Sequence, residues 1–275
     1  MNRLDTARRA MVVRCLVDGN SLRATSRITG VARMTVEKLL RDLGAACATY
    51  QDETLRGLTS KRIQCDEIWS FCYAKKKNVT AEILEKNPNA GDVWTWTAID
   101  ADTKLVLSVL VGDRTAGSAY EFMQDVASRL KNRVQLTTDG HKPYLAAVED
   151  AFGADIDYAT LTKLYGEDAN AEKRYSPATC IGCKQDVVTG DPNPKHISTS
   201  YVERQNLTMR MQMRRFTRLT NAFSKKIEMH VASVALHFMN YNFAQVHGSL
   251  RVTPAMEAGV SDHAWSIEEI VGLLG

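Results

Sequence analysis

RIQCDEIWSFCYA, at residues 62–74, opens the part of the chain that decides the fold. Two later stretches, DVWTWTAID at 92–100 and LVLSVLVGD at 105–113, share its enrichment in Val, Ile, Thr and aromatic residues. Residues of these kinds favour β-strands. The turn-forming sequence DADT at 100–103 joins the last two stretches and predicts an antiparallel hairpin. A β-sheet therefore begins near residue 62.

The segments that follow alternate between helix and strand patterns. Residues 116–133 read as an amphipathic helix, 134–139 (VQLTTD) as a short strand and 143–153 as a second helix, after which a further strand is expected. This order predicts an α/β fold in which a mixed sheet is covered by helices. The polar stretch at 75–91 is expected to be exposed, and residues 166–198, rich in Pro, Gly, Cys and Asp, form an irregular insertion.

The two ends of the chain are expected to be helical in part. Helical spacing covers 3–17, Ser21 can cap a short helix, and a turn containing Gly30 leads into a third helix from Arg33. This is the shape of a helix-turn-helix, and a plain helical hairpin is the alternative. Its DNA-contacting residues would be Arg33, Thr35 and Lys38. After the insertion, helices are expected at about 199–218 and 224–246.

Charge is distributed unevenly along a chain of 275 residues with a net charge of only +3. A basic band at 201–226 contrasts with an acidic end after Arg251, which suits contact with a polyanion. The start of the chain does not resemble a secretory signal, and the longest apolar run, from Val231, is too short to span a bilayer. The six cysteines lack regular spacing. We therefore expect a cytoplasmic protein without membrane contact.

Three acidic residues stand in settings that suit metal binding. Asp66 lies inside a predicted strand, Asp139 ends another, and Glu203 opens a basic helix. Taken singly, these residues have ordinary readings: a hydrogen-bonding residue, an Asp-Gly turn or helix cap, and an acid at a helix N-terminus. Glu67 points to the other face of its strand, so it or Asp66 is exposed or paired. Glu172 is the rival third acid, but a helix positions a ligand more rigidly than its irregular segment does.

Four blocks of the sequence resemble those of a known family. DEIWSF, TTDGHKPY, YVERQNLTMRMQMRRFTRLTNAFSKKIEMH and YNFAQVHGSLRVTPAMEAG are similar to blocks of bacterial insertion-sequence transposases of the insertion-sequence-one type. The resemblance covers roughly residues 60–260. It implies a ribonuclease-H-like core with Asp66, Asp139 and Glu203 as the DDE triad. The longer separation of Asp139 and Glu203, caused by the insertion, departs from compact integrases and leaves the third acid open.

The resemblance also implies what the protein does. A transposase of this class would bind the terminal inverted repeats of its element in double-stranded DNA, cleave there and transfer the strand to target DNA. The triad would hold two Mg²⁺ ions, with Mn²⁺ as an alternative, about 4 Å apart. Phosphate contacts are expected from the basic band, at Arg210, Arg214, Arg215 and Arg218. Two ends must be paired, so a homodimer or larger assembly is expected.

The expected organisation has three parts: a helix-turn-helix domain at 1–56, a catalytic core at 57–252 containing the insertion at 166–198, and a tail at 253–275. Two other functions fit parts of this reading. A non-catalytic helix-turn-helix regulator would need no acidic triad, and a ribonuclease-H-type nuclease or junction resolvase would lack strand transfer. Within the insertion, Cys180 and Cys183 form a CxxC that could join His196 in a zinc site, with a solvent-facing loop as the alternative.

Overall fold

The computed structural model of the protein describes residues 4–166, 179–217 and 221–275. Its described part contains one six-stranded mixed sheet with the order β3-β2-β1-β4-β5-β6. Strands β1, β4 and β5 are parallel to one another, and the others pair antiparallel. The strands are β1 (Arg62–Cys72), β2 (Gly91–Asp100), β3 (Val106–Gly112), β4 (Gln135–Thr138), β5 (Asp157–Gly166) and β6 (Thr179–Thr189).

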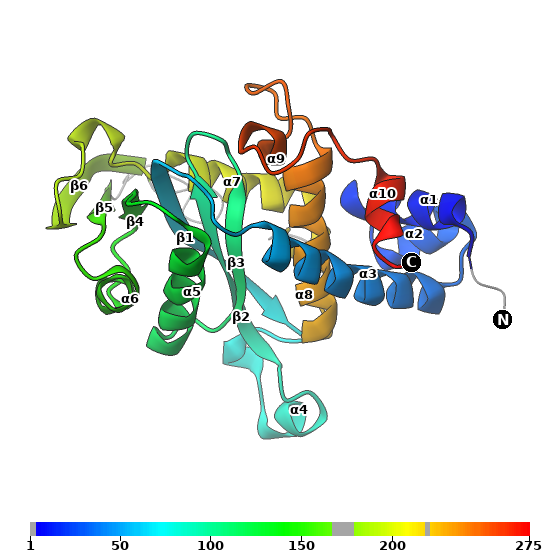
Figure 1. The fold of residues 1–275 in the computed structure, drawn as a ribbon. Helices are drawn as coiled ribbons and strands as arrows, with labels where there is room; N and C mark the ends of the chain where they lie inside the picture. Colours follow the sequence, from blue (N-terminus) through cyan, green and yellow to red (C-terminus); the bar gives the residue numbers. More distant parts are fainter. Residues whose placement is uncertain (1–3, 167–178, 218–220) are drawn as a thin grey trace.

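Helices cover both faces of this sheet (Figure 1). Their bounds are α1 (Thr6–Val17), α2 (Leu22–Thr29), α3 (Arg33–Thr54), α4 (Ala81–Lys86), α5 (Ala116–Arg129), α6 (Pro143–Phe152), α7 (Ser200–Gln212), α8 (Ile227–Met239), α9 (Pro254–Glu257) and α10 (Ile267–Gly272). Short 3-10 turns occupy 76–78, 194–196 and 214–216, and a π-helical turn follows α8 at 240–244. The mixed sheet flanked by helices confirms the predicted α/β fold and is compatible with the ribonuclease-H-like core that the family resemblance implies.

Two apolar layers hold the helices on the sheet. On one face, Phe122 of α5 and Tyr144 of α6 pack against Trp96 of β2. On the other face, Ile68 of β1 packs with Val202 of α7 and with α8 residues. Because side chains alternate along a strand, neighbouring residues of β1 face different helices. This alternation determines which acidic side chains can meet.

The amino-terminal helices share a core with the rest of the protein. Apolar residues of α1 and α3 belong to the same buried cluster as those of the sheet and of α8. Helix α3 crosses α8 so closely that a Cβ placed on Gly44 would lie 2.5 Å from the Ala232 Cα. Figure 1 shows α1, α2 and α10 gathered at the far end from the sheet, with α3 and α8 between. The N-terminal helices are therefore held against the rest of the protein by side-chain packing as well as by their covalent connection.

Several local predictions are confirmed. The Ser21 hydroxyl accepts a hydrogen bond from the Ala24 amide and caps α2, and Gly30 ends α2 with a φ of 67°. Residues 100–103 form the expected turn between β2 and β3, in which the Asp100 carboxylate accepts from the Asp102 and Thr103 amides. Whether α2, the turn and α3 act as a DNA-binding helix-turn-helix stays a prediction.

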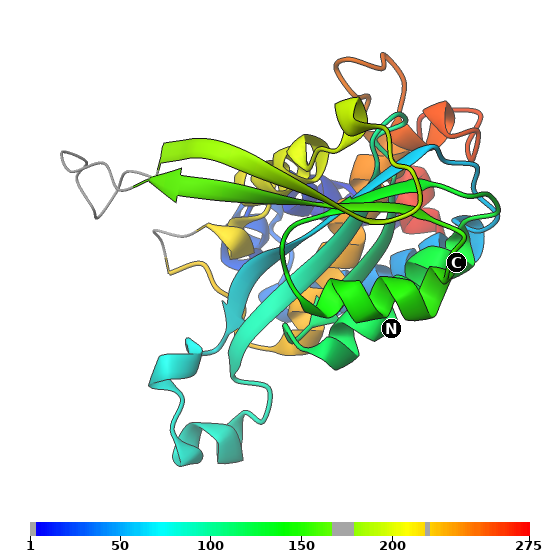
Figure 2. The ribbon, with the colours of Figure 1, turned by 90° about the vertical axis from the view of Figure 1, so that its left-hand side faces the viewer.

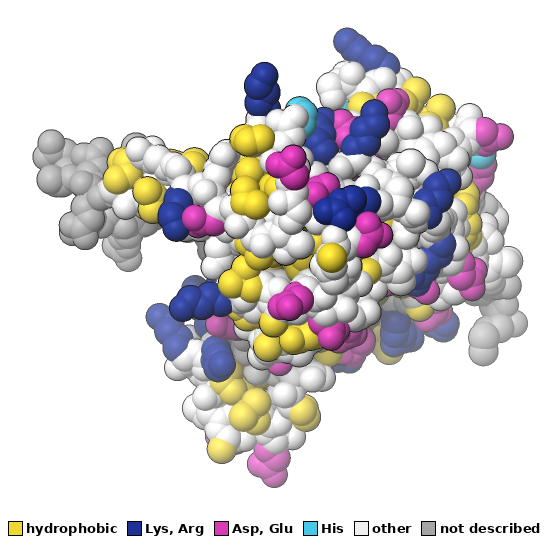
Figure 3. All heavy atoms as spheres, turned by 60° about the vertical axis from the view of Figure 1, so that its left-hand side comes forward, with side chains coloured by type: hydrophobic (Ala, Val, Ile, Leu, Met, Phe, Trp, Pro, Cys, Tyr) yellow, Lys and Arg dark blue, Asp and Glu magenta, His cyan; other side chains and the backbone are white. Residues whose placement is uncertain are grey.

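Other predictions were wrong in detail. The irregular reading of 166–198 missed β6, which pairs antiparallel with β5 along an exposed hairpin (Figure 2). The exposed stretch at 75–91 contains α4, capped by Thr80. Helices α7 and α8 end earlier than expected, at Gln212 and Met239. Exposed apolar side chains lie on the β5–β6 hairpin (Figure 3), among them Leu164 and Ile181.

In the described residues, none of the helices combines the length and the apolar character needed to cross a bilayer.

Candidate active site

Strand register brings Asp66 and Asp139 side by side. Strands β1 and β4 run parallel, and Cys65 pairs with Thr138, so the residue that follows each of them in the chain is an aspartate. Asp139 lies just beyond the carboxyl end of β4, where its side chain accepts a hydrogen bond from the His141 amide at 2.9 Å. The Asp66 carboxylate accepts from the Glu67 amide at 2.8 Å. Two of the three predicted triad residues therefore share one edge of the site.

A polar contact with β1 positions α7 above Asp66. The side-chain oxygen of Gln64 accepts hydrogen bonds from the Tyr201 and Val202 amides, at 2.8 and 3.2 Å, and so occupies the N-terminus of α7. One turn further along, the Asn206 amide donates to Asp66 Oδ2 at 2.8 Å. Gln64 and Asn206 are both buried. Because buried polar groups are costly to leave unpaired, these bonds fix the position of the helix.

Glu203 lies on the same helix as Asn206, three residues before it, but its carboxylate has other partners. It accepts a hydrogen bond from the Thr199 hydroxyl at 2.6 Å and pairs with Lys163 of β5. Its charge still acts on Asp66, whose pKa it helps to raise. Glu203 is thus close enough to Asp66 to raise its pKa, while its carboxylate is paired with Lys163 and lies outside the acidic group formed by Asp66, Glu67 and Asp139 among the described residues.

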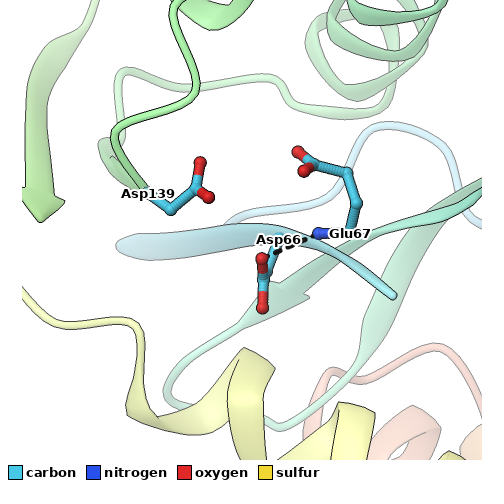
Figure 4. Close-up of side chains that lie close together, drawn as sticks. All are labelled: Asp66, Glu67 and Asp139. Carbon is cyan, nitrogen blue, oxygen red and sulfur yellow. Dashed lines mark hydrogen bonds between the residues drawn. The ribbon is translucent and has the colours of Figure 1, made fainter. Parts of the chain in front are cut away.

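Glu67 is a fourth carboxylate that the structure adds to the site. Its side chain is fully buried and lies on the opposite face of β1 from Asp66 (Figure 4). Arg114 donates to it at 3.0 Å. Arg114 also lies 3.5 Å from Asp139 and stacks over Trp94. Within residues 4–166, 179–217 and 221–275, the group of acidic, His or Cys side chains suited to a metal ion is Asp66, Glu67 and Asp139. One ligand atom of each lies within 4.8 Å of the others.

Burial and mutual repulsion shift the proton affinities of these acids. Burial raises the pKa of Asp66 to about 7, and the charges of Glu67, Asp139 and Glu203 add to the rise. Burial, then the charge of Asp139, raises the pKa of Glu67 to about 7, although the nearby Tyr144 hydroxyl and Arg114 lower it. One arginine faces several carboxylates. The site consequently favours uptake of positive charge, as protons or as a cation.

The donor atoms fit a divalent cation. Carboxylate oxygens are the ligands that Mg²⁺ and similar hard cations prefer. In the described part of the chain, the buried Glu67 Oε1 forms no hydrogen bond of acceptable geometry, which is unusual for a carboxylate oxygen. The acidic cluster thus offers the oxygen ligands that a divalent cation prefers and a negative charge that the cation would neutralise.

The predicted DNA-contacting residues that the structure describes lie on α3, on α7 and on the segment that follows α7. Arg33, Thr35 and Lys38 are exposed on the first turns of α3, where Lys38 pairs with Asp42. Arg214 is exposed, and Arg215 is half-buried against the Ser224 hydroxyl at 2.9 Å. Arg210 is half-buried on α7. Arg218 and the rival acid Glu172 lie outside the described residues.

The predicted zinc ligands are not gathered into one group. Cys180 and Cys183 are exposed on β6. The His196 ring instead contacts Arg62, with 2.8 Å between Nδ1 and a guanidinium nitrogen. Among the described residues these three side chains form no metal-binding cluster.

The sequence pointed to only some of the residues that shape this site. Asn206 was recognisable as a neighbour of Glu203 on one helix face, and the pairing of Glu67 was one of two expected outcomes. Gln64 could be found because it shares a strand face with Asp66, two residues away. Arg114 gave no signal, since it follows β3 in a loop and reaches the site only through the sheet order.

Comparison with known proteins bears on the family. Residues 187–245 match the sequence model of the IS1 transposase family. No curated protein matches the chain. Among solved structures, a piggyBac transposase synaptic complex with hairpin DNA is similar at 11% identity and a TM-score of 0.40. The match covers 98% of this chain and 69% of that one. The segment from the end of β6 through α7 and α8 thus matches the IS1 transposase family. This match agrees with the resemblance of the sequence motifs to DDE transposases.

Proposed function

We propose that this protein is a DNA transposase that binds the terminal inverted repeats of its element, cleaves the DNA there and joins the freed end to target DNA. The observation that carries the proposal is the register of β1 and β4, which sets Asp66 beside Asp139, with Asp66 bound by Asn206 of α7. The family match over 187–245 supports transposition as the context of this acidic site.

The triad of the proposal is Asp66, Asp139 and Glu203. These carboxylates would hold divalent cations, with Mg²⁺ the expected ion, and Glu67 lies beside them as a further carboxylate. When bound, a pair of such ions would supply activation of the attacking oxygen and stabilisation of the leaving 3′ oxygen. The side chains themselves hold and orient: Asn206 fixes Asp66, and the His141 amide fixes Asp139. Lys163 would have to release Glu203 when a cation is bound.

DNA would be held by the basic surface near the site. Arg33, Thr35 and Lys38 would read base edges of the repeat from the start of α3, while Arg210, Arg214, Arg215 and Arg218 would contact phosphates regardless of sequence. Binding through phosphates falls steeply as salt rises. Joining two ends would bring at least two copies of the chain together.

Cleavage and strand transfer with labelled end DNA and Mg²⁺ test the proposal. Asp139→Asn is expected to abolish both reactions and to leave end binding intact. Retained strand transfer in that variant would remove Asp139 from the triad. Parallel Glu203→Gln, Glu67→Gln and Glu172→Gln variants identify the third ligand, which is the acid whose loss abolishes the chemistry. Cleavage without strand transfer would indicate a nuclease, and binding without either would indicate a regulator.

A further inference from the structure

A second site lies away from the acidic cluster, in a cavity of about 1140 Å³ between the N-terminal helices and α8. We call it the interhelical cavity. Its walls come from the α1–α2 turn, the start of α3, residues 212–215, 221–223 and 225–226, and one side of α8. The α1–α2 turn closes against the end of α7, where a Cβ on Gly19 would lie 2.7 Å from the Gln212 carbonyl oxygen. The cavity is thus formed by tightly packed elements.

The rim of the interhelical cavity is strongly basic. Six cationic side chains line it, with Glu37 as the acid among its lining residues: Arg23, Arg33, Arg214, Arg215, Lys225 and Lys226. In the part of the chain that the structure describes, Arg23, Arg33, Arg214 and Lys225 form no ion pair. Clustered cations that are not neutralised within the protein attract anions. The rim therefore favours a ligand with several negative charges.

The floor of the cavity is apolar and contains a polar atom without a partner. Leu40 of α3 and Leu236 and Met229 of α8 are buried there. His237 is also buried, and its Nε2 forms no hydrogen bond among the described residues. Burial lowers the pKa of His237 to about 4, so the ring is neutral at physiological pH and can donate or accept one hydrogen bond. Nε2 is enclosed by protein atoms, so a ligand on the floor meets an apolar surface and a neutral ring, and it reaches Nε2 when the side chains around the ring shift.

An aromatic side chain stands at the edge of this floor. Phe223 lines the cavity, and its ring is stacked on Phe71 with the centroids 4.8 Å apart. Aromatic faces beside a basic rim are the usual means of holding unpaired bases together with their phosphates. A duplex, whose major groove alone is about 12 Å wide, is too large for this cavity. Pockets of roughly 300–1,000 Å³ hold drug-sized molecules, a size range that suits a few nucleotides.

We propose that the interhelical cavity binds unpaired nucleotides of single-stranded DNA, with the phosphates on the basic rim and a base on the apolar floor beside His237. The inference rests on the proposed function in choosing DNA as the polyanion, and the rim shares Arg33, Arg214 and Arg215 with the surface proposed to hold the end DNA. It adds a site for a displaced or frayed strand to the acidic centre and the double-stranded end.

The experiment measures binding of a fluorescein-labelled oligonucleotide of about ten nucleotides, a length within the range of known single-strand sites. The full chain is used with EDTA, so that no cleavage occurs. Lys225→Glu is expected to weaken binding about tenfold and to lower the slope of log affinity against log salt by about 0.7. Lys131→Glu is the matched control, because Lys131 is exposed, forms no ion pair among the described residues and does not line the cavity. It should bind like the wild type.

His237→Phe tests the floor separately. Phenylalanine removes a buried, unpaired nitrogen and keeps a ring, so thermal stability should be retained or rise, while single-strand affinity falls about fivefold from the loss of one hydrogen bond. Binding of a matched duplex should not change. Unaltered single-strand affinity in His237→Phe, or equal losses in the two lysine variants, would overturn the inference. If single strands bind as expected but end DNA is neither cleaved nor joined with Mg²⁺, the proposed function fails and the cavity assignment stands.

Discussion

Replacing Asp66 by Asn should abolish catalysis and yet make the metal-free protein more stable at alkaline pH. The folded state raises the pKa of Asp66 to about 7, from an ordinary value of 3.8. An acid with a raised pKa favours the folded state below its unfolded value, and this contribution is lost as pH rises through the folded value. Between these two values, the free energy of unfolding of the wild type therefore declines with pH.

The size of the effect follows from the difference of about 3 between the two pKa values, which corresponds to about 4 kcal/mol as an upper limit. An asparagine does not ionise, so the variant avoids this loss. It also fits the local hydrogen bonds. The Asn206 Oδ1 is buried and unpaired in the described part of the chain, so a flip of the Asn206 amide lets it accept from the new side chain.

Urea unfolding in EDTA at pH 5 and pH 8 measures the difference. The gain of Asp66→Asn over the wild type should be below about 2 kcal/mol at pH 5 and should rise to about 4 kcal/mol at pH 8. Asp102→Asn is the control of opposite sign, because pairing with Arg62 lowers the pKa of Asp102 and the variant should lose stability at both pH values. No gain for Asp66→Asn at pH 8 would mean that burial and the neighbouring carboxylates do not raise the pKa of Asp66 as the geometry requires.

Three further predictions concern the site and the core. Lys163→Met should free Glu203 and lower the Mg²⁺ concentration needed for half-maximal cleavage by up to about fivefold, since a partly exposed ion pair is worth about 1 kcal/mol or less. An increase in that concentration would show that Lys163 does not compete with the cation for Glu203. Gly44→Ala should cost about 3 kcal/mol of unfolding free energy by forcing α3 from α8, whereas Gly117→Ala, in open surroundings on α5, should change it by less than about 1 kcal/mol. Arg129→Met should lower the free energy of unfolding by about 3 kcal/mol in chemical denaturation, because Arg129 is buried between Asp52 and Asp125. Arg56 is exposed, so Arg56→Met should lower it by less than about 1 kcal/mol. Equal losses in the two variants would contradict this reasoning.

The sequence predicted elements where burial leaves a periodic pattern. β1, β2 and β3 were recognisable because their side chains face packed helices, and α5 and α6 because one side of each is apolar. β6 was missed for the converse reason. It is an edge strand whose described side chains are exposed or half-buried, and pairing with β5 rather than burial holds it in place. Helix α4 likewise has no buried residue. Elements stabilised by backbone pairing or caps alone carry little hydrophobic signal.

The acidic site, like the fold, could be predicted from the sequence only in part. That Asp139 ends a strand could be read locally, whereas its adjacency to Asp66 was implied by the family resemblance and not by the local pattern. The pairing of Glu203 with Lys163 could not be predicted, because it depends on β5 extending past the end of β4 toward the N-terminus of α7. Long-range contacts of this kind depend on the sheet order and on how far each strand continues. Neither is encoded in a local pattern of residues.

The polar contacts around Asp66 show how this fold tolerates its own acidic centre. A buried carboxylate needs partners, and an arginine or lysine beside Asp66 would lower its pKa and occupy the place of a cation. The neighbours that α7 and β1 supply are neutral instead: the Asn206 amide and the Glu67 backbone amide. Neutral donors orient the carboxylate without cancelling its charge, so the repulsion from Glu67 and Asp139 persists. Arg114, bound to Glu67 and Asp139 on the other face of β1, offsets only part of it. The residual negative charge is what would draw a divalent cation to this edge of the sheet.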